Sequence, residues 1–389
     1  MKWKFYSLAF VAGMSILTAC SSDDNNDNDG NGGNGNGNEI ENGTILKGTI
    51  TSDVTLAAGN TYKLSGEYSV EEGATLHIEE GVKIIAVYDD IADYILVKQG
   101  GKINAVGTPD KPIVMTSEKE EPGAWGGIHI CGRAHTNAEG GKGSSEIGGA
   151  VYGGNDDADN SGTLQYIRLE YTGFAFDEEH EANGISFYSV GNGTIVDHCQ
   201  AYKGSDDGFE FFGGSVNVSN LVAVSCSDDS FDWTEGWNGK GTNLVAYQED
   251  KSTLGYDCDC LMECDNNGSN NATPVAHPVL KNLILVGNGG SKQGIRLRAG
   301  TEVEIDNAKV CGKGQPLTVE TALTENALKN GTSKLTNITL TSELSSKEGI
   351  YTHADFIAVT SNKVDANLSY SSFEDIRKEC SWMNGSWVK

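Results

Sequence analysis

The chain of 389 residues is short of basic side chains and of proline. It has 28 Lys and Arg against 55 Asp and Glu, a net charge of −27, and only 6 prolines. Proteins hold nucleic acid chiefly through cations that displace counterions, so such an acidic surface argues against nucleic acid as a partner. Glycine is abundant: 50 glycines with 38% hydrophobic residues predict a chain that buries a core and turns often, and exclude a disordered polymer.

Long hydrophobic runs are also missing, and the apolar stretch Leu8 to Leu17 is too short to cross a bilayer as a stable helix. Lys2 and Lys4 precede it and small residues lead from it to Cys20, an order typical of a signal peptide. The run Leu-Thr-Ala-Cys ending at Cys20 resembles the bacterial lipobox. This implies removal of residues 1–19 and anchoring of acylated Cys20 in membrane lipid. An ordinary cleaved signal peptide with an incidental cysteine is the alternative.

Residues 20–43 form the second predicted segment. Ser21 to Asn38 is almost wholly Ser, Asp, Asn and Gly, has nothing to bury, and predicts a disordered acidic tether. The pair Asp23-Asp24 resembles the surface-export signal of Bacteroidota lipoproteins. This implies a lipid-anchored protein of the outer membrane that faces the cell exterior, with other outer-membrane proteins as partners to consider. Periplasmic retention is the alternative.

From Thr44 the chain alternates apolar and polar residues in short runs between glycine-marked turns, which predicts strands. Ser205-Asp-Asp-Gly-Phe-Glu-Phe-Phe212 returns 22 residues later as Ser227-Asp-Asp-Ser-Phe-Asp-Trp-Thr234. A repeat of about 22 residues matches one coil of a parallel β-helix. The sequence therefore predicts an all-β fold with a parallel β-helix over residues 44–345. A C-terminal segment, 346–389, is expected to cap the last coil, with a short helix at Ser371 to Cys380.

Asparagine precedes an apolar residue at five places along the predicted helix: Asn220, Asn243, Asn282, Asn307 and Asn337. The intervals of 23, 39, 25 and 30 residues fit coils with insertions at their turns. We expect these residues to stack at the start of one strand in each coil. Their side-chain amides would form an internal ladder, each bonding to the next. The role predicted for them is structural.

Four segments carry a resemblance to a known family: Trp125-Gly-Gly-Ile, Asp206 to Gly214, Phe231 to Trp237 and Gly294 to Arg298. They look like recurring motifs of right-handed β-helix lipoproteins of Bacteroidota, whose fold is that of the pectin-lyase superfamily. The likeness runs from about Ala57 to Gly300. It implies a right-handed parallel β-helix and leaves the activity open, because these lipoproteins are largely uncharacterised and one fold hosts many functions.

Stacking the repeats predicts which side chains meet. Alternate residues of a strand point inward and outward, so Phe211, Trp233, Cys264 and Leu297 are expected in the core. The first outward column would contain Ser186, Glu210, Asp232, Glu263 and Arg296, with His129 before it. The second outward column would contain Tyr188, Phe212, Thr234, Asp265 and Arg298. These two columns form the one cluster of polar side chains that the sequence predicts across several coils.

Like charges in the first column need compensation, because neighbouring strands lie about 4.8 Å apart. Arg296 is expected to pair with Glu263, which leaves Glu210 and Asp232 to be relieved by a cation, by raised pKa values or by splaying into water. Oxygen ligands suit Ca²⁺. The candidate calcium ligands are Glu210, Asp232, Asp206 and Asp228. The alternatives are a solvated acidic face and turn aspartates that cap their own backbone.

Aromatic residues on this flank favour carbohydrate binding, because flat rings beside acidic and amide groups hold sugar faces. Tyr188 and Phe212 are expected outside, with Trp237 and Phe174 to Phe176 in nearby turns. The alternative for Phe212 is that it covers the sheet under a loop. The predicted ligand-binding residues are Glu210, Asp232, Glu263, Arg296, Asp265, Arg298, Tyr188 and Phe212. The working hypothesis is a non-catalytic carbohydrate-binding or adhesion module, with calcium as the one cofactor indicated.

Two other functions stay open. A polysaccharide lyase or glycoside hydrolase could use the same face, and the Asp-Asp-Gly run looks superficially like a polygalacturonase signature. The companion Gly-His-Gly and Arg-x-Lys motifs of that family are absent, and the seven histidines show no Ser/His/Asp grouping by spacing. No catalytic residue is assigned. The third reading is a passive structural or adhesin protein.

Overall fold

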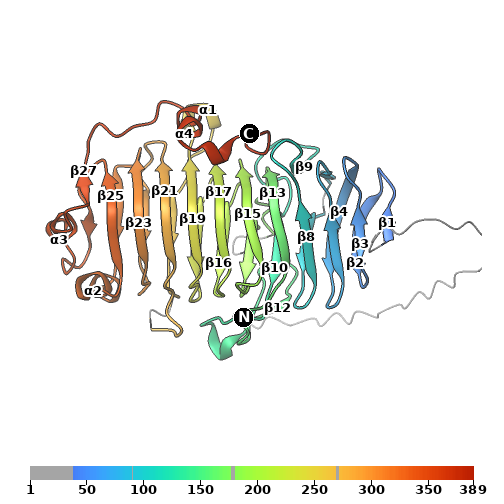
Figure 1. Cartoon of the computed structure of the whole chain (residues 1–389), viewed down its shortest axis with the longest axis horizontal. Helices are drawn as coiled ribbons and strands as arrows, with labels where there is room; N and C mark the ends of the chain where they lie inside the picture. Colours follow the sequence, from blue (N-terminus) through green and yellow to red (C-terminus); the bar gives the residue numbers. More distant parts are fainter. Residues whose placement is uncertain (1–37, 90, 177–179, 269–270) are drawn as a thin grey trace, which may run out of the picture. The chain divides into compact units, whose positions relative to one another are not determined.

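A computed structural model describes residues 38–389 except 90, 177–179 and 269–270 (Figure 1). The predicted signal peptide, Cys20, and nearly all of the Ser21 to Asn38 tether lie outside the described residues. Strand β1 (Asn38–Ile40) begins inside the segment 20–43, so the β-structure starts earlier than predicted. The last paired strand, β27 (Lys363–Val364), lies beyond the predicted end at residue 345.

The described chain is a right-handed parallel β-helix, as predicted, and 25 of its strands join one continuous hydrogen-bonded sheet. Each coil contributes to three faces of stacked parallel strands. The early strands of the first face are β1, β3 (Val54–Leu56), β5 (Thr75–Ile78) and β8 (Lys102–Val106). The early strands of the second face are β2 (Ile45–Ile50), β4 (Thr61–Val70), β6 (Lys83–Ala86) and β9 (Ile113–Ser117).

Later coils join the first and second faces through one long, bent strand. These long strands are β13 (Gly162–Glu170), β15 (Ile195–Tyr202), β17 (Asn217–Val224), β19 (Lys240–Tyr247), β21 (Val279–Val286), β23 (Glu304–Cys311) and β25 (Lys334–Leu340). The third face begins with the last residues of β2 and β4. It continues through β7 (Tyr94–Val97), β10 (Ile128–Cys131), β14 (Ile185–Tyr188), β16 (Phe209–Phe212), β18 (Phe231–Thr234), β20 (Met262–Cys264), β22 (Gln293–Leu297), β24 (Gln315–Val319) and β26 (Ser345–Ser346).

The asparagine ladder forms, but outside the core. Asn243 donates to Asn220 over 2.8 Å, Asn282 to Asn243 over 3.0 Å, and Asn307 to Asn282 over 2.8 Å. Asn337 donates instead to Asp306 over 2.7 Å. The prediction of an internal ladder at a strand start was wrong.

The ladder lies at the bend of the long strands, where the backbone is left-handed. The five asparagines have φ between 56° and 62°. Asparagine tolerates this conformation better than most residues, because its short polar side chain bonds locally. The side chains at this bend are half-buried or exposed. The asparagines therefore stabilise the left-handed bend of the backbone as well as the stacking of the coils.

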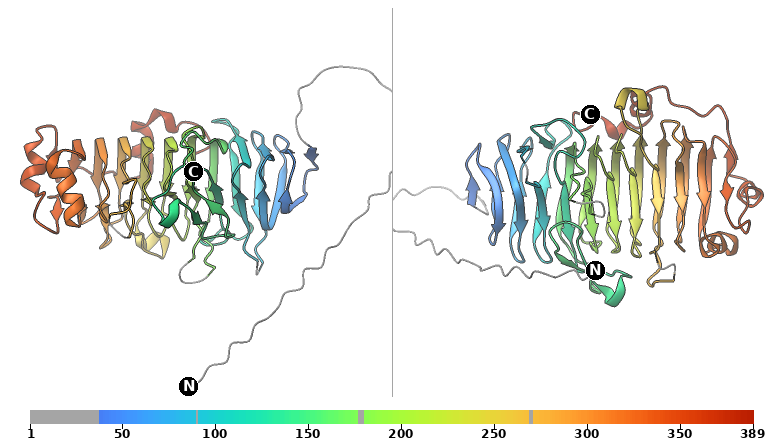
Figure 2. Two further views of the ribbon diagram at one scale, coloured as in Figure 1. Left: turned by 90° about the horizontal axis from the view of Figure 1, so that it is seen from below. Right: turned by 180° about the vertical axis from the view of Figure 1, so that it is seen from behind.

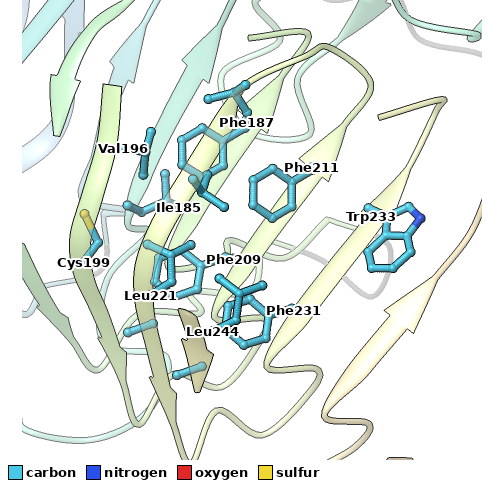
Figure 3. Close-up of a cluster of buried hydrophobic side chains, with 14 of the residues drawn as sticks. Ile185, Phe187, Val196, Cys199, Phe209, Phe211, Leu221, Phe231, Trp233 and Leu244 are labelled. Carbon is cyan, nitrogen blue, oxygen red and sulfur yellow. The ribbon is translucent and has the colours of Figure 1, made fainter. Parts of the chain in front are cut away.

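The core fills the space between the three faces, and buried side chains of successive coils pack against one another (Figure 3). Phe187 stacks on Phe211 with ring centroids 5.0 Å apart, and Phe209 stacks on Phe231 at 5.6 Å. The predicted core residues Phe211, Trp233, Cys264 and Leu297 are all buried. Repeated aromatic and aliphatic layers therefore stabilise the middle of the helix.

The segment 346–389 was predicted to cap the last coil, and only its first part does so. Helix α3 (His353–Ala358) of this segment lies at the end of the β-helix (Figure 1). Helix α2 (Ala322–Asn330) lies at the same end but precedes β25, inside the segment predicted to be coils. Helix α4 (Phe373–Glu379) and the 3-10 turn η2 (Ser381–Met383) run back along the outer side of the second face (Figure 2).

The C-terminal segment that contains α4 and η2 packs against apolar side chains on the outer side of the second face. Ile376, Met383 and Trp387 share a buried cluster with Val222 and Val245 of the long strands. An apolar strip of this kind is unstable in water unless it is covered, which explains why the segment turns back.

Three smaller elements leave the coils. A two-stranded hairpin of β11 (Gly143–Ser144) and β12 (Val151–Tyr152) follows the 3-10 turn η1 (Glu139–Gly141). The one-turn helix α1 (Lys251–Leu254) is capped by Asp250. Within the described residues, no helix is long and apolar enough to cross a membrane.

Candidate functional site

The strand pairing of the third face confirms the predicted columns. Glu210 lies opposite Ser186 on one side and Asp232 on the other. Asp232 lies opposite Glu263, which lies opposite Arg296. His129 precedes Ser186, as expected. The register therefore brings the carboxylates together on adjacent strands.

The C-terminal part of this face is an ion-pair network. Arg296 lies 2.7 Å from Glu263, as predicted, and 3.3 Å from Glu320. Arg298 lies 2.7 Å from both Glu263 and Asp265. Glu320 was missed because it follows the end of β24, beyond the strands that the repeat aligned. The two arginines have carboxylate partners, which leaves little attraction for an external anion.

The middle of the face is covered, which corrects the predicted aromatic platform. Tyr188 is 0% exposed and Phe212 is 7% exposed. Both pack with Ile147 and Tyr152 of the hairpin segment. The insertion between β10 and β13 folds back over these columns, and strand register contains no information about where an insertion packs. The alternative reading, that Phe212 covers the sheet under a loop, is confirmed.

Trp237 is also a core residue and not a surface ring. Its side chain is 1% exposed and stacks on Phe211 with centroids 4.2 Å apart. Of the predicted aromatic residues, Phe174 is half-buried and Phe176 remains at the surface. Phe176 is 41% exposed.

Glu210 is buried beneath the hairpin segment. Asn183 donates to its Oε2 over 2.5 Å. Burial, and then the charge of Glu146, raises the pKa of Glu210 well above its ordinary value. Glu146 accepts a 3.3 Å bond from Tyr188, and burial raises its pKa to about 7. Glu146 belongs to the insertion, so no repeat in the sequence pointed to it.

The turn aspartates divide into two kinds. Asp207 accepts a 2.8 Å bond from the backbone N–H of Asp229, and Asp229 accepts a 2.6 Å bond from that of Cys260. These second aspartates cap the next coil, which corrects the alternative interpretation that they cap their own backbone. The stacking of the turns brings a backbone N–H of the next coil within hydrogen-bond distance of each carboxylate.

The first aspartate of each pair, Asp206 and Asp228, is half-buried. Burial, and then the charge of Asp228, raises the pKa of Asp206 to about 7. Burial, and then the charge of Asp259, raises the pKa of Asp228 to about 6. The positive charge near these turns is therefore too small to offset the burial and mutual repulsion of the carboxylates.

An open pocket lies on the N-terminal side of the covered columns. It has a volume of about 540 Å³ and is lined by Glu67, Ile91, Ala92, Tyr94, Phe174, Ala175 and Phe176. The Phe176 ring lies 5.2 Å from that of Phe174 and 5.9 Å from that of Tyr94, both edge to face. Tyr94 donates to Glu67 over 2.8 Å. The pocket combines an exposed ring with a carboxylate and a phenol.

The match to known proteins agrees with this architecture. The family model described as "Pectate-lyase like beta helix domain" matches residues 48–388, most of the chain. The chain belongs to this family. Comparisons with curated proteins and with solved structures give no significant match. The pectate-lyase-like β-helix accounts for the coils and the three faces, and a fold of this kind does not by itself specify a reaction.

On this pectate-lyase-like β-helix, the described residues offer three chemically different places. The arginine network is internally neutralised, the pocket at Phe176 is open and amphipathic, and the turns at Asp206 and Asp228 concentrate negative charge. The pocket suits a neutral polar ligand with an apolar face. The carboxylate turns suit a hard cation.

Proposed function

We propose that the protein is a surface-exposed lipoprotein whose β-helix binds carbohydrate without cleaving it. The observation that carries the proposal is the pocket of Phe174, Phe176, Tyr94 and Glu67. It replaces Tyr188 and Phe212, which are buried, as the predicted sugar-binding surface.

The pocket has the composition that sugars require. The C–H face of a pyranose ring packs against an exposed aromatic side chain, here Phe176, while its hydroxyl groups bond to a few fixed polar atoms. Glu67 and the phenol of Tyr94 supply such atoms, held by their mutual 2.8 Å bond. The volume of about 540 Å³ falls within the range of ordinary ligand sites and accommodates a short saccharide.

A binding role without cleavage is favoured by the carboxylates of the pocket. Glycoside hydrolases place two carboxyl groups on either side of the scissile bond. Among the described residues that line the pocket, Glu67 is the one carboxylate. The rival lyase or hydrolase would instead use the third face, where Glu146 and Glu210 have raised pKa values.

Phe176→Ala is expected to weaken glycan binding at least about tenfold, because it removes the exposed ring that packs against the sugar. The measurement is retention and affinity of the purified protein on a panel of neutral and acidic glycans, with reducing and unsaturated ends followed in parallel. Tyr88→Ala is the matched control, since Tyr88 is 52% exposed but lies outside the lining.

Equal loss in both variants would contradict a role for the pocket. New chain ends would establish the lyase or hydrolase instead. Neither retention nor cleavage on any glycan would leave the passive structural or adhesin role.

The lipid anchor at Cys20 is part of the same proposal and has its own test. Cys20→Ala is expected to move the protein from the membrane fraction to the soluble fraction, because several acyl chains together anchor a protein stably. Protease treatment of intact cells should cut the wild type. Replacing Asp23 and Asp24 with asparagine should leave the protein in the membrane but protect it from the protease. An uncut wild-type protein would show periplasmic retention.

A further inference from the structure

Five carboxylates gather on β16, on β18 and in the turns that lead into these strands: Asp206, Asp207, Glu210, Asp228 and Asp232. In the part of the chain that the structure describes, none of the five forms an ion pair with lysine or arginine. The nearest cations are already occupied, since Arg298 contacts Glu263 and Asp265, and Lys292 contacts Asp259.

The five form two overlapping groups. In one group, oxygens of Asp206, Asp207 and Asp228 all lie within 4.8 Å of one another. In the other, oxygens of Asp207, Glu210 and Asp232 do so. Two oxygens that ligate the same Ca²⁺ at 2.3–2.6 Å are at most about 5 Å apart, so each group has the spacing of a coordination shell. Asp207 belongs to both.

An acidic cluster alone is weak support for a site, and two buried acceptors supply the independent observation. Asn183 is 1% exposed and its amide group contacts Glu210, yet its Oδ1 has no hydrogen-bond partner. Asp232 Oδ1 is likewise shielded from solvent and has no partner. A buried acceptor without a partner destabilises the fold, because the atom has lost its hydrogen bonds to water. A cation would satisfy both atoms.

We infer that these turns bind two calcium ions, one per group, with the Asp207 carboxylate shared between them. Asp206 and Asp228 complete the first subsite. Glu210, Asp232 and the Asn183 carboxamide complete the second. The donors are all hard oxygens, which favours Ca²⁺ over softer metals that select sulfur or imidazole. The inference does not depend on whether the pocket at Phe176 binds sugar.

The test counts calcium ions per chain. The full-length protein in detergent is stripped with a chelator and equilibrated with radioactive calcium across a dialysis membrane. Wild type is expected to bind two ions. Asp206→Asn and Glu210→Gln are each expected to bind one, because each change weakens its own subsite at least about a hundredfold. Asp207→Asn is expected to bind none.

Glu263→Gln is the control, since Glu263 lies in the same column but is neutralised by Arg296 and Arg298. It should retain two ions. The melting temperature of the wild type should rise with calcium, because a ligand that binds only the folded state stabilises it. If Asp207→Asn does not fold, the calcium count of Asp206→Asn and of Glu210→Gln still tests whether there are two subsites.

Three results would overturn the inference. A wild type that binds no calcium would show that the acids are relieved by protonation or water. A single ion would show that Asp207 is not shared. Loss of an ion in Glu263→Gln would place the site in the arginine network.

Discussion

Glu325→Ala is expected to lower the free energy of unfolding by about 3 to 5 kcal/mol, because it removes a buried carboxylate that accepts four hydrogen bonds from the C-terminal end. We call this carboxylate the C-terminal anchor. The Glu325 side chain is 0% exposed. Its carboxylate accepts backbone bonds from Glu348 at 2.8 Å, Ile350 at 2.6 Å and Tyr351 at 3.0 Å, and a 2.8 Å bond from the Ser346 hydroxyl. Hydrogen bonds to a charged group contribute about 1.5 to 3 kcal/mol each, and the donors left behind are poorly hydrated.

The charge on Glu325 is essential to this anchor. Burial acts to raise its pKa, but the four hydrogen bonds outweigh burial and the pKa lies below its ordinary value. A lowered pKa means that the stabilisation is present above the unfolded pKa and is lost as the pH falls through the folded one.

Glu325→Gln should therefore cost less than alanine and should remove the acid dependence of the C-terminal end. Urea unfolding at pH 7 and pH 4 measures both effects. Glu343→Ala, at an exposed site on the same segment, is the control and should stay within about 0.5 kcal/mol of wild type. Equal stability of the Glu325 and Glu343 variants would contradict the anchor.

Trp237→Ala is expected to cost about 3 to 5 kcal/mol, the usual range for a buried tryptophan replaced by alanine. The indole stacks on Phe211 at 4.2 Å and lies 5.8 Å from the Trp233 ring. Its Nε1 donates to the carbonyl of Val216 over 3.2 Å. Removing it opens a cavity at the centre of the helix, where the coils above and below cannot close it.

Trp237→Phe should restore most of the loss, because the ring is kept and one hydrogen bond is lost. Trp382→Ala, on the half-buried C-terminal flank, should cost less than Trp237→Ala. Chemical denaturation followed by tryptophan fluorescence and circular dichroism measures all three. A larger loss at Trp382 than at Trp237 would show that the flank, and not the central core, limits stability.

The register of the third face could be predicted because a β-helix repeats residue by residue. The 22-residue repeat placed Glu210 against Asp232, and the alternation of inward and outward side chains put Phe211 and Trp233 in the core. The pairing of Arg296 with Glu263 followed from the same alignment.

The surface of that face could not be predicted in the same way. Tyr188 points outward in its strand, as the alternation requires, yet it is buried by an insertion that no repeat describes. Asn243 was correctly placed in a ladder but incorrectly placed inside, because periodicity does not reveal that the strand bends there in the left-handed region. The pocket residues Glu67 and Phe176 come from different coils, so their meeting depends on how the loop after β13 folds.

The sequence by itself determined the coils, the strand register, the core layers and the composition of the outward columns. Each of these depends on neighbours one coil apart, and a repeat of about 22 residues records such neighbours directly. The tertiary structure decided which outward side chains are exposed to solvent and which are covered by the hairpin or by the C-terminal segment that packs on the second face. It also decided which buried hydrogen-bond acceptors have no partner. Those outcomes depend on packing between segments far apart in the chain, where no repeat relates one residue to the next.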